Sequence, residues 1–109
     1  MSAVLDLLAE LDDIGRDERG GWTRPGFGPE ALALQQWFEA CAAAIGLDVS
    51  RDRNGNLWAW WGAPGPGAVV TGSHLDSVPG GGAFDGPLGV ATGSARVSCT
   101  LPRSDALRI

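Results

Sequence analysis

The 109-residue sequence contains no Lys and no Tyr, a single His and only two Cys. All 8 basic residues are therefore Arg, and against 13 Asp and Glu they leave a net charge of −5. This acidic balance argues against nucleic acid or an anionic membrane surface as the main partner. No apolar run approaches the roughly 20 residues of a membrane span, and the N-terminus lacks the basic and apolar regions of a secretion signal. We therefore expect a cytoplasmic protein with no nucleic-acid and no membrane partner.

The two cysteines and the length add further limits. Cys41 and Cys99 do not have the spacing of metal ligands, and Cys41 lies within an apolar helical pattern. We interpret both as reduced thiols. A chain of 109 residues forms one small domain or a piece of a larger one.

Hydrophobic spacing predicts two helices in the first half of the chain. The first covers residues 3–15, with an apolar stripe at helical spacing. The second begins at Pro29, where the missing N–H of proline costs nothing, and runs to about Ile45 before Gly46 ends it. A polar, glycine-rich loop joins the two helices.

A hairpin and one further strand are predicted next. Residues 47–51 and 57–61 flank a turn that contains Asn54-Gly55, a strong short-range hairpin signal. The second of these strands carries Trp58, Trp60 and Trp61, and we expect all three rings in the core. Residues 68–71 read as a short strand of the buried, parallel-sheet type. Two helices, a hairpin and a buried strand together predict an α/β domain.

The chemistry is concentrated in residues 72–90, which include the only His of the chain. On a strand, His74 and Asp76 leave the same face, so Asp76 is placed to accept the N–H of an imidazole that binds a metal through its other nitrogen. Asp85 follows a loop of three glycines and is able to reach the same cation from another side. The alternatives are a hydrogen-bonded structural His74 and a turn residue at Asp85. A hydrolytic triad is excluded because Ser73, His74 and Asp76 are neighbours on one strand and cannot converge on one carbon.

The run T-G-S-H-L-D-S-V-P-G-G-G-A-F-D-G-P-L-G-V at residues 71–90 resembles the first metal-binding motif of the M20-type metal-dependent amidohydrolases and peptidases. The closest similarity is to the hydantoinase/carbamoylase branch, which contains allantoate amidohydrolases and N-carbamoyl-L-amino-acid hydrolases. Residues 20–24, 46–49 and 52–57 also agree with this branch. The resemblance covers about residues 3–90.

The resemblance implies a fold, a cofactor and roles for three residues. The fold would be the N-terminal part of a di-metal, zinc-peptidase-like catalytic domain, an incomplete α/β sheet with flanking helices. His74 would bind one metal ion, Asp85 would bridge two, and Asp76 would support His74. Two divalent ions, zinc or manganese, would activate a water for amide hydrolysis. The peptide bond from Asp85 to Gly86 is often cis in this family, although a non-proline cis bond is costly.

Other parts of the family's site are missing from this sequence. The general-base glutamate and the remaining ligands lie downstream in the family, together with a smaller domain that supports dimerisation, so a complete relative is expected to be a homodimer. Two ligands hold a metal only weakly. We therefore expect the 109 residues to be inactive alone.

The tail departs from the family. Residues 1–90 carry 12 acidic residues against 5 Arg, whereas residues 91–109 carry Asp105 against three Arg and show no convincing apolar stripe at helical spacing. We predict a boundary at residue 90, with residues 1–90 as the hydrolase portion and residues 91–109 as an aberrant or out-of-frame tail.

Three functions remain open at this point. The first is a fragment of a hydrolase that acts on carbamoyl or ureido C–N bonds of small molecules such as allantoate or N-carbamoyl-L-amino acids. The second is a fragment of an M20 aminoacylase or dipeptidase, and the third is a truncated product without activity. Because an incomplete sheet leaves an unpaired edge, we also expect aggregation or weak protection from hydrogen exchange.

Overall fold

The computed structural model describes residues 3–98 and 105–109. In chain order its elements are helix α1 (Ala3–Ala9), helix α2 (Pro29–Ala44), strands β1 (Asp48–Arg51), β2 (Leu57–Trp61) and β3 (Val69–Gly72), helix α3 (Pro87–Ser98) and strand β4 (Asp105–Arg108). The reduced thiol expected at Cys99 lies outside the described residues. No helix among the described residues has the length and the apolar character needed to cross a membrane.

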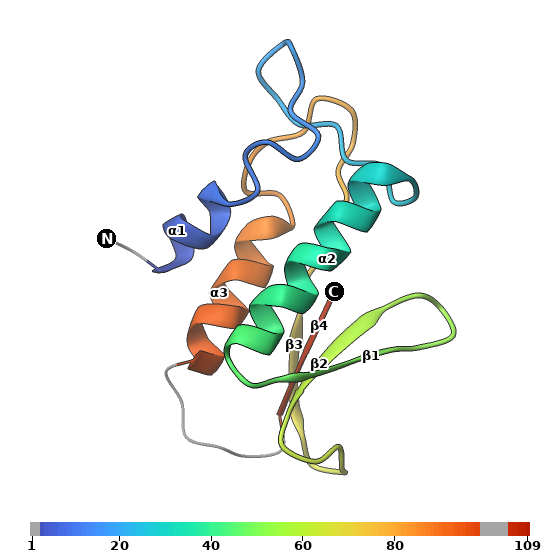
Figure 1. Ribbon diagram of the computed structural model, residues 1–109, viewed down its shortest axis with the longest axis vertical. Coiled ribbons are helices and arrows are strands. Elements are labelled where there is room, and N and C mark those ends of the chain that lie inside the picture. The colour runs from blue at the N-terminus through green and yellow to red at the C-terminus, as the bar shows by residue number, and fades with distance from the viewer. Residues whose placement is uncertain (1–2, 99–104) are drawn as a thin grey trace.

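The four strands form one mixed sheet in the order β1-β2-β4-β3. Strands β1 and β2 pair antiparallel, β2 and β4 pair antiparallel, and β3 and β4 pair parallel. Figure 1 shows α2 and α3 side by side across one face of this sheet. Helix α2 packs against β1 and β2, and α3 packs against β3, β4 and α1. The α/β prediction is therefore confirmed.

The core lies between the two long helices and the sheet. Alternation along β2 directs Leu57 and Ala59 toward the helices, where both are buried. They belong to a cluster of buried residues from the helices, the sheet and the loops: Leu11, Leu34, Phe38, Ala42, Leu47, Leu57, Ala59, Leu75 and Val90. Phe38, only 1% exposed, is the largest side chain that is fully buried.

The hairpin turn is organised by one carboxylate. Asp52 Oδ1 accepts hydrogen bonds from the backbone N–H groups of Asn54 and Asn56, both at 2.9 Å. Its Oδ2 accepts from Trp58 Nε1 at 3.0 Å and from Asn56 Nδ2 at 2.9 Å. These bonds, that from Trp58 first, lower the pKa of Asp52 to about 2. Gly55 has a φ of 85°, so the Asn-Gly turn forms where the sequence places it.

Several local expectations are wrong. The first helix ends at Ala9, because the chain then tightens into turns such as the bond from Leu11 N to Leu8 O at 3.0 Å. Trp58 and Trp60 are only half-buried, since they face away from the helices and stack on each other at 6.2 Å. In β3, Val69 and Val70 are 60% and 49% exposed because this strand is the last in the described sheet.

The tail is more regular than its sequence pattern predicts. Helix α3 begins at Pro87, within the predicted hydrolase portion, and continues past Val90 to Ser98. It does so through small residues: Ala91, Gly93 and Ser94 are buried, so the packed face has little apolar bulk. Residues 105–108 then pair with both β2 and β3. The predicted origin of the tail in another reading frame stays a prediction.

Candidate functional site

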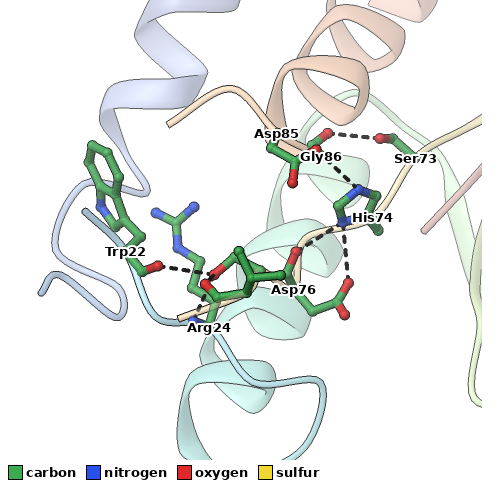
Figure 2. Close-up of polar contacts among 9 residues, drawn as sticks. Trp22, Arg24, Ser73, His74, Asp76, Asp85 and Gly86 are labelled. Atoms are coloured by element: carbon green, nitrogen blue, oxygen red, sulfur yellow. Dashed lines mark hydrogen bonds and ion pairs between the residues drawn. The ribbon is translucent and has the colours of Figure 1, made fainter. Parts of the chain in front are cut away.

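The residues singled out in the 72–90 segment lie at one edge of the sheet. Strand β3 ends at Gly72, and His74 and Asp76 follow it directly. Asp85 lies just before α3, so the loop of residues 77–85 returns it to the carboxyl end of β3. This is the edge at which α/β sheets place their sites. Figure 2 shows the side chains of His74, Asp76 and Asp85 gathered there.

One nitrogen of the His74 ring is held by Asp76. The ring Nδ1 lies 2.9 Å from the backbone carbonyl oxygen of Asp76 and 3.3 Å from its Oδ1. A carbonyl oxygen only accepts hydrogen bonds, so Nδ1 must be the nitrogen that carries the proton. The lone pair of the neutral ring is then on Nε2. The carboxylate of Asp76 lies beside His74 as expected, but the shorter of the two contacts is made by the backbone carbonyl of Asp76.

The other nitrogen faces Asp85. His74 Nε2 and Asp85 Oδ1 are 3.8 Å apart, which is too long for a hydrogen bond. Two donors on one tetrahedral zinc ion, each about 2.1 Å from it, lie about 3.4 Å from each other. A neutral imidazole and a carboxylate are also the ligands that zinc accepts. The donor pair therefore fits a divalent cation in both chemistry and spacing.

The pair is not a complete metal site by itself. Among residues 3–98 and 105–109, no three His, Cys, Asp or Glu side chains gather closely enough to hold an ion. His74 and Asp85 are also open to solvent, with side chains 51% and 68% exposed. The remaining ligands of a closed site would have to come from outside the described residues.

Two glycines allow α3 to approach the end of β3. Gly86 has a φ of 90°, and a Cβ there would lie 2.7 Å from the Nδ1 and Cε1 atoms of His74. A Cβ at Gly89 would lie 2.7 Å from the Cβ of Ser73. Ser73 Oγ in turn donates a hydrogen bond to the carbonyl oxygen of Gly86 at 2.9 Å. These close approaches bring Asp85 to the Nε2 side of the imidazole.

The peptide bond between Asp85 and Gly86 is trans, as are all peptide bonds in the described part of the chain. This differs from the cis bond that the resemblance implies. The trans form is lower in free energy by about 3 kcal/mol for a residue other than proline. The positive φ of Gly86 turns the chain at this point without it.

A cavity of about 450 Å³ adjoins the site. His74 and Asp76 line one side of it, and the hairpin turn with Asn54 and Asn56 lines another. Arg51 also lines it, where its Nη2 donates to Gln35 Oε1 at 2.7 Å. The volume is within the range of small-molecule pockets.

Sequence reasoning gave no role to Ser73 and treated Arg24 only as part of a matching segment. Arg24 is 2% exposed, and its backbone bonds to Ser77. A single Arg within a glycine-rich loop carries no spacing signal that distinguishes a buried residue from a surface one. This backbone bond joins Arg24 to a residue 53 positions further along the chain, and therefore only the structure identifies it.

No protein-family model matches the chain. Solved structures with the same arrangement include a hydantoinase/carbamoylase family amidase from Burkholderia ambifaria (34% identity, TM-score 0.85, covering 97% of this chain and 27% of that one). The described part of the chain thus has the α/β arrangement of one part of this amidase.

Curated sequences agree with the solved structures. The chain is 42% identical to an N-carbamoyl-L-amino acid amidohydrolase of Geobacillus stearothermophilus over 88 residues, which are 79% of this chain and 22% of the relative. It is also 42% identical to the allantoate amidohydrolase of Escherichia coli K12 over 89 residues, 80% of this chain and 22% of the relative. The chain is homologous to these amidohydrolases and to the hydantoinase/carbamoylase family amidase, and it spans 22% of the length of the two curated relatives and 27% of the solved structure.

Proposed function

We propose that these residues supply one part of a metal-dependent hydrolase of non-peptide C–N bonds, with carbamoyl or ureido compounds such as N-carbamoyl-L-amino acids or allantoate as substrates. The observation that carries the proposal is the imidazole of His74, whose Nδ1 is held by Asp76 while Nε2 faces the Asp85 carboxylate at 3.8 Å. This pair occurs in a chain 42% identical to relatives with those two names.

Each residue has a separate task in this proposal. His74 would hold one ion through Nε2, and Asp85 would bridge two ions. Asp76 would keep the proton on Nδ1 through its carbonyl and its carboxylate. These contacts would fix the ring orientation and make Nε2 a stronger metal ligand. Two divalent ions, zinc or manganese, would supply Lewis acidity and a water of lowered pKa when bound.

The remaining chemistry would come from residues outside these 109. A general-base glutamate and further ligands are needed for turnover, and the complete enzyme is proposed to be a cytoplasmic homodimer of the M20 type. By itself the chain offers two ligands, so it should bind a cation weakly and hydrolyse nothing.

Calorimetric titration with zinc tests the ligand assignment. We expect weak binding by the chain and at least tenfold weaker binding by His74→Ala and Asp85→Asn, since each substitution removes half of the donor pair. Asp48→Asn is the matched control, because it removes one exposed carboxylate from β1 without touching the pair. Equal affinities among all four proteins would exclude His74 and Asp85 as ligands in this chain.

A turnover assay tests the substrate class. With added manganese or zinc, the isolated chain should not hydrolyse allantoate or N-carbamoyl-L-amino acids, whereas a longer protein that contains this segment should. Hydrolysis of N-acyl amino acids or dipeptides by that longer protein, without action on carbamoyl substrates, would instead support an aminoacylase or dipeptidase.

A further inference from the structure

The loop before α2 and the loop after His74 are joined by a dense set of hydrogen bonds. Trp22 and Gly81 exchange two backbone bonds, N to O at 2.9 Å in one direction and 2.7 Å in the other. Gly80 N donates to Thr23 Oγ1 at 3.0 Å. Ser77 N donates to the Arg24 carbonyl at 2.8 Å, and Arg24 N donates to Ser77 Oγ at 3.0 Å. We call this set of contacts between residues 22–24 and 77–81 the loop clamp.

The guanidinium of Arg24 attaches the loop clamp to the core. Its Nε donates to the carbonyl of Ile14 at 2.9 Å and its Nη2 to the carbonyl of Leu11 at 2.8 Å. Burial lowers the pKa of Arg24, and the charge of Asp12 partly opposes that shift. A cation stays buried only where its N–H groups have acceptors, so these two carbonyls fix the position of residue 24.

The peptide group between Asp76 and Ser77 connects the loop clamp with the imidazole. Its N–H, on Ser77, donates to the Arg24 carbonyl, and its C=O, on Asp76, accepts from His74 Nδ1. A trans peptide group is planar, with N–H and C=O pointing in opposite directions. Holding the N–H toward Arg24 therefore directs the C=O toward His74. Figure 2 shows Asp76 between Arg24 on one side and His74 on the other.

We propose that Arg24 is a positioning residue: through Ser77 it sets the orientation of the 76–77 peptide group, which keeps the proton of His74 on Nδ1 and turns Nε2 toward Asp85. The metal role of Nε2 rests on the proposed function, but the orientation of the ring does not. The Arg24 carbonyl, the 76–77 peptide group and the His74 ring form a continuous chain of hydrogen bonds, in which each bond polarises the next.

The single histidine makes the test direct, because the chain gives only one pair of imidazole nitrogen signals. Two-bond nitrogen–proton NMR at about pH 8.5, above the ordinary histidine pKa, separates the protonated ring nitrogen from the unprotonated one. In the unsubstituted chain without metal, the proton should be on Nδ1. In Arg24→Gln and in Ser77→Ala, the two nitrogen signals should move toward each other and toward the Nε2–H form that free histidine favours. Arg24→Lys, which can still reach one carbonyl, should restore part of the difference.

Two controls separate positioning from general loss of stability. The guanidinium groups of Arg24 and Arg16 both lie near the Trp22 ring, with their Cζ atoms 5.5 Å and 4.3 Å from its centroid. Arg16→Gln removes the second of them and should leave the imidazole signals unchanged. Leu34→Ala destabilises the core without touching the loop clamp, and it should also leave them unchanged. Ser77→Ala decides the outcome if Arg24→Gln does not fold.

If the substituted chains fold and keep the proton on Nδ1 as firmly as the unsubstituted chain, the proposal is wrong. The zinc titration separates this result from a failure of the proposed function. Suppose that the NMR signals change as expected while His74→Ala binds zinc as well as the unsubstituted chain does. That combination would support the positioning role of Arg24 and exclude the metal role of His74.

Discussion

Cys41 illustrates how one neighbour changes the chemistry of a side chain. It lies half-buried on α2, and its Sγ is 3.9 Å from Glu10 Oε2, which also accepts a hydrogen bond from Trp37 Nε1 at 2.8 Å. Burial, and then the charge and the hydrogen bond of Glu10, raise the pKa of the Cys41 thiol to about 11. Because the thiolate is the reactive form, this cysteine should be inert at neutral pH.

Replacing Glu10 with Gln should make Cys41 more reactive. Gln keeps an oxygen for Trp37 but removes the negative charge, so the pKa of Cys41 should fall from about 11 toward its ordinary value of 9.0. In a Cys99→Ser background, alkylation by iodoacetamide at pH 8 should become several-fold faster. Glu39→Gln, elsewhere on α2, is the matched control and should have no effect. An unchanged rate in Glu10→Gln would show that burial alone protects the thiol.

The same thiol makes the stability of the chain depend on pH only in alkali. A pKa that is higher in the folded chain than in the unfolded one means that folding favours the protonated thiol. Its contribution is therefore fully present below pH 9 and is lost as the pH rises toward about 11.

At the level of elements, the sequence predicts what depends on local chemistry. Pro29 and Gly46 bound α2 where expected, and the Asn54-Gly55 turn forms the hairpin. The sequence does not predict that α3 continues past Val90, because the buried face of this part of the helix consists of Ala91, Gly93 and Ser94. Such small residues do not form an apolar stripe at helical spacing. Strand β4 was missed because four residues carry no period of their own and pair only when β2 and β3 are present.

In the candidate site, too, local sequence predicts some features, and other features depend on distant parts of the chain. Spacing along one strand predicts that His74 and Asp76 are close, and a flexible loop predicts that Asp85 returns. The main-chain contact of Asp76, and the attachment of Ser77 to Arg24, depend on a loop from another part of the chain. No local pattern contains that information.

The junction between β3 and α3 should be sensitive to a methyl group at Gly86. Gly86→Ala places an L-residue at a φ of 90° and sets its Cβ 2.7 Å from the His74 ring. The unfavourable φ costs about 1–2 kcal/mol, and the steric conflict adds to it. Gly20→Ala is the matched control, since Gly20 has a φ of 100° but no atom near its Cβ position. Urea denaturation should therefore show a larger loss of unfolding free energy in Gly86→Ala than in Gly20→Ala.

Equal losses in the two variants would mean that the His74 ring moves aside without cost. In that case the orientation of His74 would not depend on its contact with Gly86.

For the whole molecule, the sheet determines how the chain behaves in solution. In the described sheet β1 and β3 are the edge strands, and β3 carries two exposed valines, Val69 and Val70. Exposed apolar edge strands pair with other molecules. The chain should therefore self-associate as its concentration rises.

A charge on β3 should reduce this association. Val70→Lys places a cation on the edge strand at a side chain that is already 49% exposed, so folding should be little affected. Sedimentation velocity should show a larger share of monomer across a concentration series. Val78→Lys is the control, because Val78 is 66% exposed but lies in a loop. If both substitutions reduce association equally, net charge rather than the strand edge controls it.

The order of the sheet also has a consequence during synthesis. The hairpin of β1 and β2 can form as soon as those residues leave the ribosome, but in the described sheet β3 joins only through β4, which follows it in the chain. Until residues 105–108 emerge, β3 has no partner in the sheet order and its two valines remain open to chaperones. Ribosome-bound chains halted before and after these residues should therefore differ in the protection of β3, while the hairpin is equally protected in both.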